Sequence, residues 1–512
     1  MASMREPDAA SQTPLLGDTD AAAEEPTAYG TAETHAALSE EEQQGVFKRN
    51  LGTIEAFAII ISIVVGSGIF TSPGAIDQNV PSPGAALLTW LIGGALAWTG
   101  ATTLAELGTA IPGEGGVQAY LQYIFGDVFG FLAAWTWVVA VMPATLAILS
   151  IVFVDSILSA AGVASEAGSL KHKLLSIAIL VVTNTSNAIS TKASTRLNNF
   201  FVVTKFIGIL AVMAAGLGVV IAHSLGRDAK NGGKDWFRRS WFENRDSFNP
   251  DGSRIVWGDL HAIYITAELS APARQLPLAI NSSIPTVVVG FVAANAAYYV
   301  LLPWNMISIT DSVAVTAITR LLGRAFGIIA AVVVCLVVAG SLLGNSFVAG
   351  RMAVAAARRG WLPEIFGRIG YGDFTLRSSP SEDVSSPEEP GVPVDDSKSD
   401  APVYALILST ILSAVYIAFG NFRSLLTFNG MGEYSFFFLT VLGALVLRFR
   451  DPSLDRPYKP FIVIPLLFAF VSLFIVVRGA TFEPLLFGVL ALVWAVGLGF
   501  YVLRRTLAAW SS

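Results

Sequence analysis

The sequence predicts an all-α polytopic membrane protein with about twelve spans, and three observations support this fold class. Hydrophobic residues make up 54% of the 512 residues and charged residues only 14%, which is too apolar for a soluble protein of this length. The mean hydropathy of +0.62 agrees. The apolar residues form long runs separated by polar segments, and the basic residues gather in alternate connections between these runs, as the positive-inside rule requires.

Eleven apolar runs are each long enough to cross ~30 Å of hydrocarbon as a helix. They lie at about 53–76, 84–111, 128–160, 172–190, 199–222, 283–307, 325–356, 402–420, 424–447, 460–478 and 483–503. A further crossing is required after the fifth run, because the Arg-rich connections at 351–377 and 448–459 otherwise fall outside the cytoplasm. Residues 255–267 provide only ~20 Å of helix and include Asp259 and His261. We therefore expect twelve spans with the sixth truncated.

Polar segments divide the chain into regions. Residues 1–45 are acidic, with Arg5 as their single basic residue, which predicts a disordered cytoplasmic tail before the transmembrane domain at 50–507. Residues 374–400 are dense in Ser, Pro, Asp and Glu, which predicts a disordered cytoplasmic linker. The segment 224–254 is predicted to be an extracytoplasmic loop. Its three large aromatic side chains, Trp236, Phe237 and Trp241, either lie at the membrane interface or cover the helical bundle.

The first apolar run contains an unusual sequence, IIISIVVGSGIFTSP at 59–73. Gly66, Ser67 and Gly68 lie in its middle, and two glycines so close together weaken a helix. Unwound backbone inside a bilayer must be buried in protein or line a cavity. The N–H groups that start the following half-helix would then bind a carboxylate. The alternative is that these small residues form a helix-packing face.

Four polar side chains lie within predicted spans, where an ionisable group costs roughly 2.5–3.5 kcal/mol to insert. Glu433 lies ~14 Å into its span and therefore near the midplane, which favours function over a structural polar pair. Lys205 and Glu106 lie toward the cytoplasmic ends of their spans, so a coupling role and a structural role remain equally open. Asn295 is most simply an interhelical hydrogen-bonding residue.

Five motifs are distributed along the chain after residue 50. They are VGSGIFTSPG (65–74), AELGTAIPGEGGVQAYL (105–121), YITAELSAPARQLPLAI (264–280), GSLLGNSFVAGRMAVAAARRGWLP (340–363) and LRFRDPSLDRPYKP (447–460). They resemble, in order, the broken first helix, the second helix with its re-entrant connection, the exit of the sixth helix, the eighth helix and the connection after the tenth in the amino acid/polyamine/organocation (APC) superfamily. Within it, the chain is similar to the L-type amino acid transporter group and most of all to its fungal methionine-permease-like members.

The resemblance implies a LeuT-like fold of two inverted five-helix repeats plus two further helices. It places a substrate at the midplane between the broken first and sixth helices. The N–H groups of the Gly66–Gly68 segment would bind the carboxylate of an amino acid. Backbone carbonyls around Ile63 and Val64 would bind its amine, with Val65 between the two groups.

Two side chains acquire roles from the same resemblance. Lys205 falls where the superfamily often has a lysine in place of a bound sodium ion, and Glu433 falls at a pocket-lining position of the tenth helix. The implied function is secondary transport of neutral L-amino acids, large or sulfur-containing, by alternating access. The expected location is the plasma membrane, with a vacuolar or other internal membrane as the alternative.

One segment departs from the family pattern. Between Trp257 and Tyr264 the family has a further apolar half-helix and an aromatic, glycine-containing unwound segment, where this sequence has GDLHAI. The departure coincides with the short sixth span and indicates an incomplete gene model or a splice variant, with a degenerate protein as the alternative. The competing function is therefore a non-transporting amino-acid sensor or an inactive variant of such a transporter.

The expected partners are the lipid bilayer and a small amino-acid substrate, without nucleic acid, cofactor or metal. No enzyme is expected, because four scattered His and one Cys suggest neither a metal site nor a nucleophile with a base. Animal L-type transporters carry a cysteine in the outer connection between spans 3 and 4, whereas AAGVASEAGSLKHK (160–173) contains none. Because Cys335 lies within a span, no disulfide-linked heavy subunit is expected.

Overall fold

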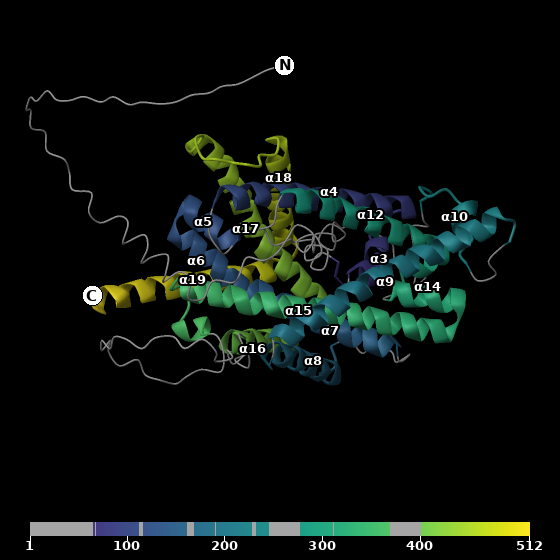
Figure 1. Ribbon diagram of the computed structural model, residues 1–512, viewed down its shortest axis with the longest axis horizontal. Helices are drawn as coiled ribbons and strands as arrows, with labels where there is room; N and C mark the ends of the chain where they lie inside the picture. Colours follow the sequence, from purple (N-terminus) through teal and green to yellow (C-terminus); the bar gives the residue numbers. More distant parts are fainter. Residues whose placement is uncertain are drawn as a thin grey trace, which may run out of the picture. The chain divides into compact units, whose positions relative to one another are not determined.

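A computed structural model describes the protein at residues 65–66, 68–111, 116–160, 168–189, 191–227, 232–244, 277–310, 312–368 and 401–511. All regular structure in these ranges is helical (Figure 1). The expected tail at 1–45 and the expected linker at 374–400 lie outside the described residues, as does the segment 255–267 of the truncated sixth span.

The described helices follow the apolar runs of the sequence. In chain order they are α3 (Gly68–Asp77), α4 (Pro83–Ala110), α5 (Val117–Phe125), α6 (Asp127–Thr136), the π-helical turn η1 (Trp137–Val141), α7 (Met142–Ala160), α8 (Leu170–Ile189), α9 (Thr191–Ser224), α10 (Asp235–Arg238), α12 (Pro277–Leu301), α13 (Trp304–Ile307), α14 (Val313–Leu322), α15 (Arg324–Arg358), the 3-10 turn η2 (Glu364–Gly367), α16 (Val403–Phe419), α17 (Phe422–Arg450), α18 (Val463–Phe482) and α19 (Pro484–Ser511).

Eight helices within the described ranges are long and apolar enough to cross a membrane. They are Pro83–Ala110, Asp127–Leu158, Phe200–Ser224, Asn281–Leu301, Arg324–Arg358, Phe422–Arg450, Val463–Phe482 and Pro484–Leu507. Each coincides with a predicted apolar run, and α8 and α16 occupy two further runs. These helices confirm the predicted all-α polytopic membrane fold.

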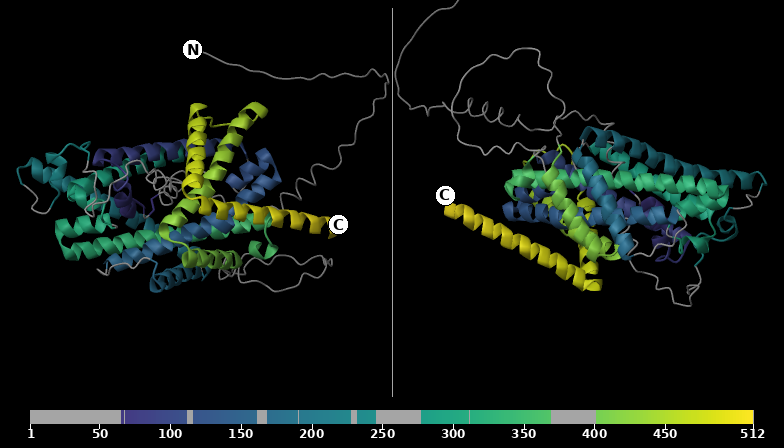
Figure 2. Two further views of the ribbon diagram at one scale, coloured as in Figure 1. Left: turned by 180° about the vertical axis from the view of Figure 1, so that it is seen from behind. Right: turned by 90° about the horizontal axis from the view of Figure 1, so that it is seen from below.

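Helices that correspond in the two expected repeats pack together in pairs. The second and seventh spans, α4 and α12, lie side by side (Figure 1), where a Cβ at Gly94 would collide with Val288 and Trp90 meets Phe291 edge-on at 5.5 Å. The third and eighth spans, α7 and α15, also lie side by side, as the views in Figures 1 and 2 both show. Two helices of one expected repeat therefore pack against their counterparts in the other.

The third span contains an irregular turn that the sequence does not predict. Between α6 and α7 the chain makes the π-helical turn η1, which widens the helix and leaves a carbonyl free to bond outside it. The Val139 carbonyl accepts a hydrogen bond from the Tyr416 hydroxyl of α16 at 3.2 Å. Such single π turns occur frequently at functional sites.

Candidate functional site

The helix start at Gly68 is the first component of the candidate site. Helix α3 begins at Gly68, so the predicted interruption of the first apolar run coincides with a helix N-terminus. Its first N–H groups have no acceptors within the helix. A Cβ built at Gly66 meets nothing within 4 Å, and Val65 beside it is buried. Among the residues that the structure describes, none therefore fills the space beside Gly66, next to these backbone donors. Ile63, Val64 and Ser67 lie outside the described residues.

Lys205 lies on a helix that packs against this start. A Cβ at Gly208 of α9 would lie 3.3 Å from the ring of Phe70, which belongs to the first turn of α3. Lys205 is three residues before Gly208 and therefore shares its helix face. The lysine is 2% exposed. The structure thus brings the face of α9 that carries Lys205 to the beginning of α3.

The opposite end of α3 is fixed by a buried carboxylate that the sequence analysis missed. Asp77 is fully buried and accepts a hydrogen bond from the Tyr299 hydroxyl of α12. Nearby, a Cβ at Gly74 would lie 2.6 Å from the Thr310 carbonyl and 2.8 Å from that of Ile307. An acidic residue at the end of an apolar run was the available signal in the sequence. These contacts hold α3 in a fixed position against the seventh span.

Residues 232–244, the main described part of the predicted extracytoplasmic loop, lie over the same end. The indole of Trp241 donates to the Trp236 carbonyl at 3.1 Å, and its ring centroid lies 6.1 Å from that of Tyr299 and 6.0 Å from that of Trp304. The Trp241 carbonyl accepts from the Gly84 N–H of α4 at 2.7 Å. Of the two alternatives for this loop, its two tryptophans therefore cover the helical bundle.

Glu433 lies near the middle of α17, facing the third span. It is buried, and a Cβ at the preceding Gly432 would lie 3.2 Å from Val141 of the π turn. One helical turn earlier, Asn429 accepts a hydrogen bond from the Thr145 hydroxyl of α7 at 3.3 Å. The two polar side chains form a stripe along α17, because residues four apart share a face. Sequence analysis missed Asn429, although its spacing from Glu433 was visible.

Helices α3 and α17 have different main neighbours. The main neighbours of α3 are α4, α12, α13 and α14, whereas α17 packs against α4, α5, α7, α18, α19 and η1. Helix α4 contacts both. A single pocket that contains both the Gly66–Gly68 segment and Glu433 stays a prediction.

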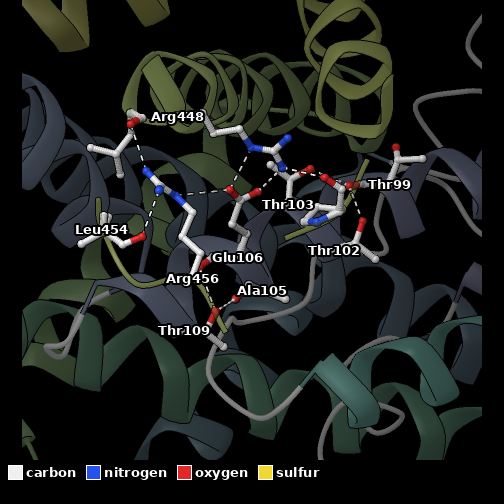
Figure 3. Close-up of polar contacts among 11 residues, drawn as sticks. Thr99, Thr102, Thr103, Ala105, Glu106, Thr109, Arg448, Leu454 and Arg456 are labelled. Atoms are coloured by element: carbon white, nitrogen blue, oxygen red, sulfur yellow. Dashed lines mark hydrogen bonds and ion pairs between the residues drawn. The ribbon is translucent and has the colours of Figure 1, made fainter. Parts of the chain in front are cut away.

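Glu106 lies in an ion cluster near the C-terminal end of α4. Figure 3 shows its carboxylate between the guanidinium groups of Arg448 and Arg456. Arg448 binds it through two nitrogens, with Nε 2.9 Å from Oε1, and also donates to the Pro460 carbonyl at 2.8 Å. The Nε atom of Arg456 lies 3.7 Å from Oε1. The carboxylate of Glu106 is therefore bound by two arginines, and the choice between a coupling role and a structural role stays a prediction.

Asn295 has a local partner. Its side-chain amide donates to the Phe291 carbonyl at 2.8 Å, one turn earlier on α12. The interhelical role stays a prediction. Among the residues that the structure describes, no group of three or more His, Cys, Asp or Glu side chains could hold a metal ion.

Comparison with known proteins places these features in a family. The sequence profile of the family described as "Amino acid permease" matches residues 51–496. The chain is 29% identical to the cystine/glutamate transporter of Homo sapiens, over 89% of this chain and 85% of that protein. It is 29% identical to the b(0,+)-type amino acid transporter 1 of Mus musculus (85% and 84% covered). It is 28% identical to the large neutral amino acids transporter small subunit 2 of Homo sapiens (89% and 80% covered).

These matches confirm the resemblance to the APC superfamily and its L-type group, while the similarity to fungal methionine-permease-like members stays a prediction. The profile covers most of the chain, and the apolar helices span most of the same range. The protein is an integral, multi-pass membrane protein and belongs to the amino acid permease family.

Proposed function

We propose that this protein is a secondary transporter of neutral L-amino acids, large or sulfur-containing, that works by alternating access. The observation that carries the proposal is the helix start at Gly68 within a membrane-spanning chain, where the first N–H groups have no acceptor within the helix and a Cβ at the nearby Gly66 meets no described atom within 4 Å. The relatives above are named for amino acids with different side chains. What those substrates share is an α-carboxylate and an α-amine, so a site built from backbone groups suits all of them.

The proposed site assigns a role to each component. The N–H groups of the Gly66–Gly68 segment bind the carboxylate, and the carbonyls around Ile63 and Val64 bind the amine, with Val65 between the two groups. Lys205 supplies a fixed positive charge in place of a sodium ion. Glu433 either binds a proton that moves with the substrate or contacts a polar part of it.

The substitution Gly66→Val tests the site. The Cβ of the new side chain meets no described atom within 4 Å, so we expect the fold to accommodate it while the carboxylate site is filled. We expect uptake of radiolabelled L-methionine by a permease-deficient yeast to fall at least about tenfold, the equivalent of one lost charge-assisted hydrogen bond. The control is Gly218→Val, at an exposed glycine of α9 that also meets nothing within 4 Å. Equal uptake by both variants at equal surface expression would contradict the proposed site.

A non-transporting sensor is the second candidate, and the GDLHAI segment at 258–263 favours it. Binding and uptake are therefore measured together, for this chain and for a chain that carries an apolar half-helix at this position. Binding by both chains without uptake by either supports the sensor. Uptake by the restored chain supports transport by the fold.

We also propose that no heavy subunit is linked to this protein by a disulfide. Cys335 is the single cysteine of the sequence and lies within α15, away from the connection between the third and fourth spans. On non-reducing gels the protein should migrate without a covalent partner. A partner that persists in Cys335→Ser would require a linkage other than a disulfide.

A further inference from the structure

Glu106, Arg448 and Arg456 form an ion cluster that is almost fully buried, and groups of the protein itself compensate its charges. The side chains are 2%, 6% and 5% exposed. Two guanidinium groups face one carboxylate, but Arg456 Nη2 also donates to the Leu447 and Asp451 carbonyls, both at 2.9 Å, at the end of α17. Helix C-termini carry partial negative charge, and Glu106 itself lies in the last turns of α4. The described groups therefore compensate the second positive charge without a further ligand.

Helix α17 connects two pairs of helices. Its middle packs on the third span, where Gly432 meets Val141 and Phe436 and Phe437 meet Trp137 at ring distances of 6.0 and 5.8 Å. Its cytoplasmic end is bound to α4 by the ion cluster. Because α4 pairs with α12 and α7 pairs with α15, α17 is attached to both pairs at different heights.

We propose that Glu106, Arg448 and Arg456 form a clamp that stays closed throughout transport, so that the cytoplasmic half of α17 moves with α4 and not with α7. The proposal rests on the proposed function, because alternating access moves one group of helices against the other. Relative motion is then taken up within α17 at Gly430 and Gly432, where missing side chains weaken the helix. Since Glu433 follows directly, the clamp sets the position of that carboxylate in each state.

The clamp stays closed because opening it would separate both ion pairs in a medium of low dielectric. Loss of one partner of a buried pair shifts an equilibrium roughly a hundred- to a few-thousand-fold. A helix bend at two glycines requires much less. Glu106 and Arg448 are accordingly positioning residues, which act on the substrate site through α17.

Distances between spin labels test the clamp in the full-length chain. In a Cys335→Ser background, one pair joins Ala95→Cys of α4, which is exposed, to Phe449→Cys of α17, which is 76% exposed. The reference pair joins Phe449→Cys to Phe129→Cys of α6, which is 38% exposed. We expect the α4–α17 distance distribution to be the same with and without saturating L-methionine. A shift of its maximum on adding L-methionine would overturn the proposal.

A second comparison needs no substrate and so separates failure of the clamp from failure of the proposed function. Glu106→Gln should broaden and shift the α4–α17 distribution, and Arg448→Lys, which keeps the charge but loses the two-pronged contact, should do so to a smaller extent. The matched control is Asp155→Asn, which removes the carboxylate charge from the 2.8 Å contact with His172 between α7 and α8 and should leave this distribution unchanged. A distribution that stays narrow in both clamp variants would show that the cluster does not hold α17.

Discussion

Two adjacent tyrosines on α12 show how a single hydrogen bond changes the contribution of a buried hydroxyl to the stability of the fold. Tyr298 and Tyr299 are 1% and 2% exposed. The Tyr299 hydroxyl donates to the buried carboxylate of Asp77, whereas the Tyr298 hydroxyl has no hydrogen-bond partner in the described part of the chain. A buried hydroxyl stabilises the fold only when its desolvation is offset by a bond.

The matched substitutions to phenylalanine should therefore differ. Tyr299→Phe removes a donor to a carboxylate and should lower the free energy of unfolding by ~1.5–3 kcal/mol. Tyr298→Phe removes a hydroxyl without a described partner and should be neutral or slightly stabilising. Thermal unfolding of the detergent-solubilised protein measures both. Equal losses for the two variants would mean that the Asp77 contact contributes nothing.

The proposed role of Lys205 leads to a prediction about which ion is coupled to transport. A fixed lysine charge repels a sodium ion at close range, so uptake should not change when external sodium is replaced by choline at constant pH and ionic strength. Lys205→Met should lower uptake at least about tenfold, because the charge is then missing from the membrane interior. The control is Lys171→Met, at an exposed lysine of α8. Uptake that rises steeply with sodium would contradict this role.

At the scale of single helices, the sequence predicts the position of α17 and of Glu433 but not what they face. Apolar length and the charges after Leu447 define the helix, because insertion into a bilayer depends on local composition. The π turn opposite Gly432 has no comparable signal, since WVVAV is as apolar as the residues around it. Asp77 and Asn429 were missed for a related reason: their partners, Tyr299 and Thr145, lie far away in the sequence.

Glu433→Gln tests the function of α17, because it keeps the shape of the side chain and removes its charge. If Glu433 binds the coupled proton, accumulation should lose its pH dependence while exchange continues. If it contacts the substrate, the order of preferred amino acids should change while the pH profile stays. Radiolabelled uptake at several pH values, with competing amino acids, separates the two.

The control on the same helix is Ser435→Ala, whose hydroxyl, within the described part of the chain, donates to the Met431 carbonyl one turn earlier at 2.7 Å. Its pH profile and substrate order should match those of the unmodified chain. A Glu433→Gln variant that behaves like this control would leave Glu433 with a purely structural role.

At the scale of the whole molecule, the fold class and most spans follow from the sequence, because every apolar run of this length has to cross the bilayer as a helix. The pairing of α4 with α12 and of α7 with α15 does not follow from composition. It depends on contacts between distant residues, such as Gly94 with Val288. The truncated sixth span at 255–267 stays a prediction, and so does the half of the substrate site that it would contribute.

The central claim is that this fold moves amino acids across a membrane, and counterflow in liposomes tests it most directly. The purified chain, and the chain with an apolar half-helix at 258–263, are reconstituted into liposomes loaded with unlabelled L-methionine. Labelled L-methionine outside should then accumulate transiently in liposomes that contain the restored chain, and Gly66→Val in that chain should abolish the accumulation. Absence of counterflow from a folded, reconstituted and restored chain, with every neutral amino acid tested, would contradict the account.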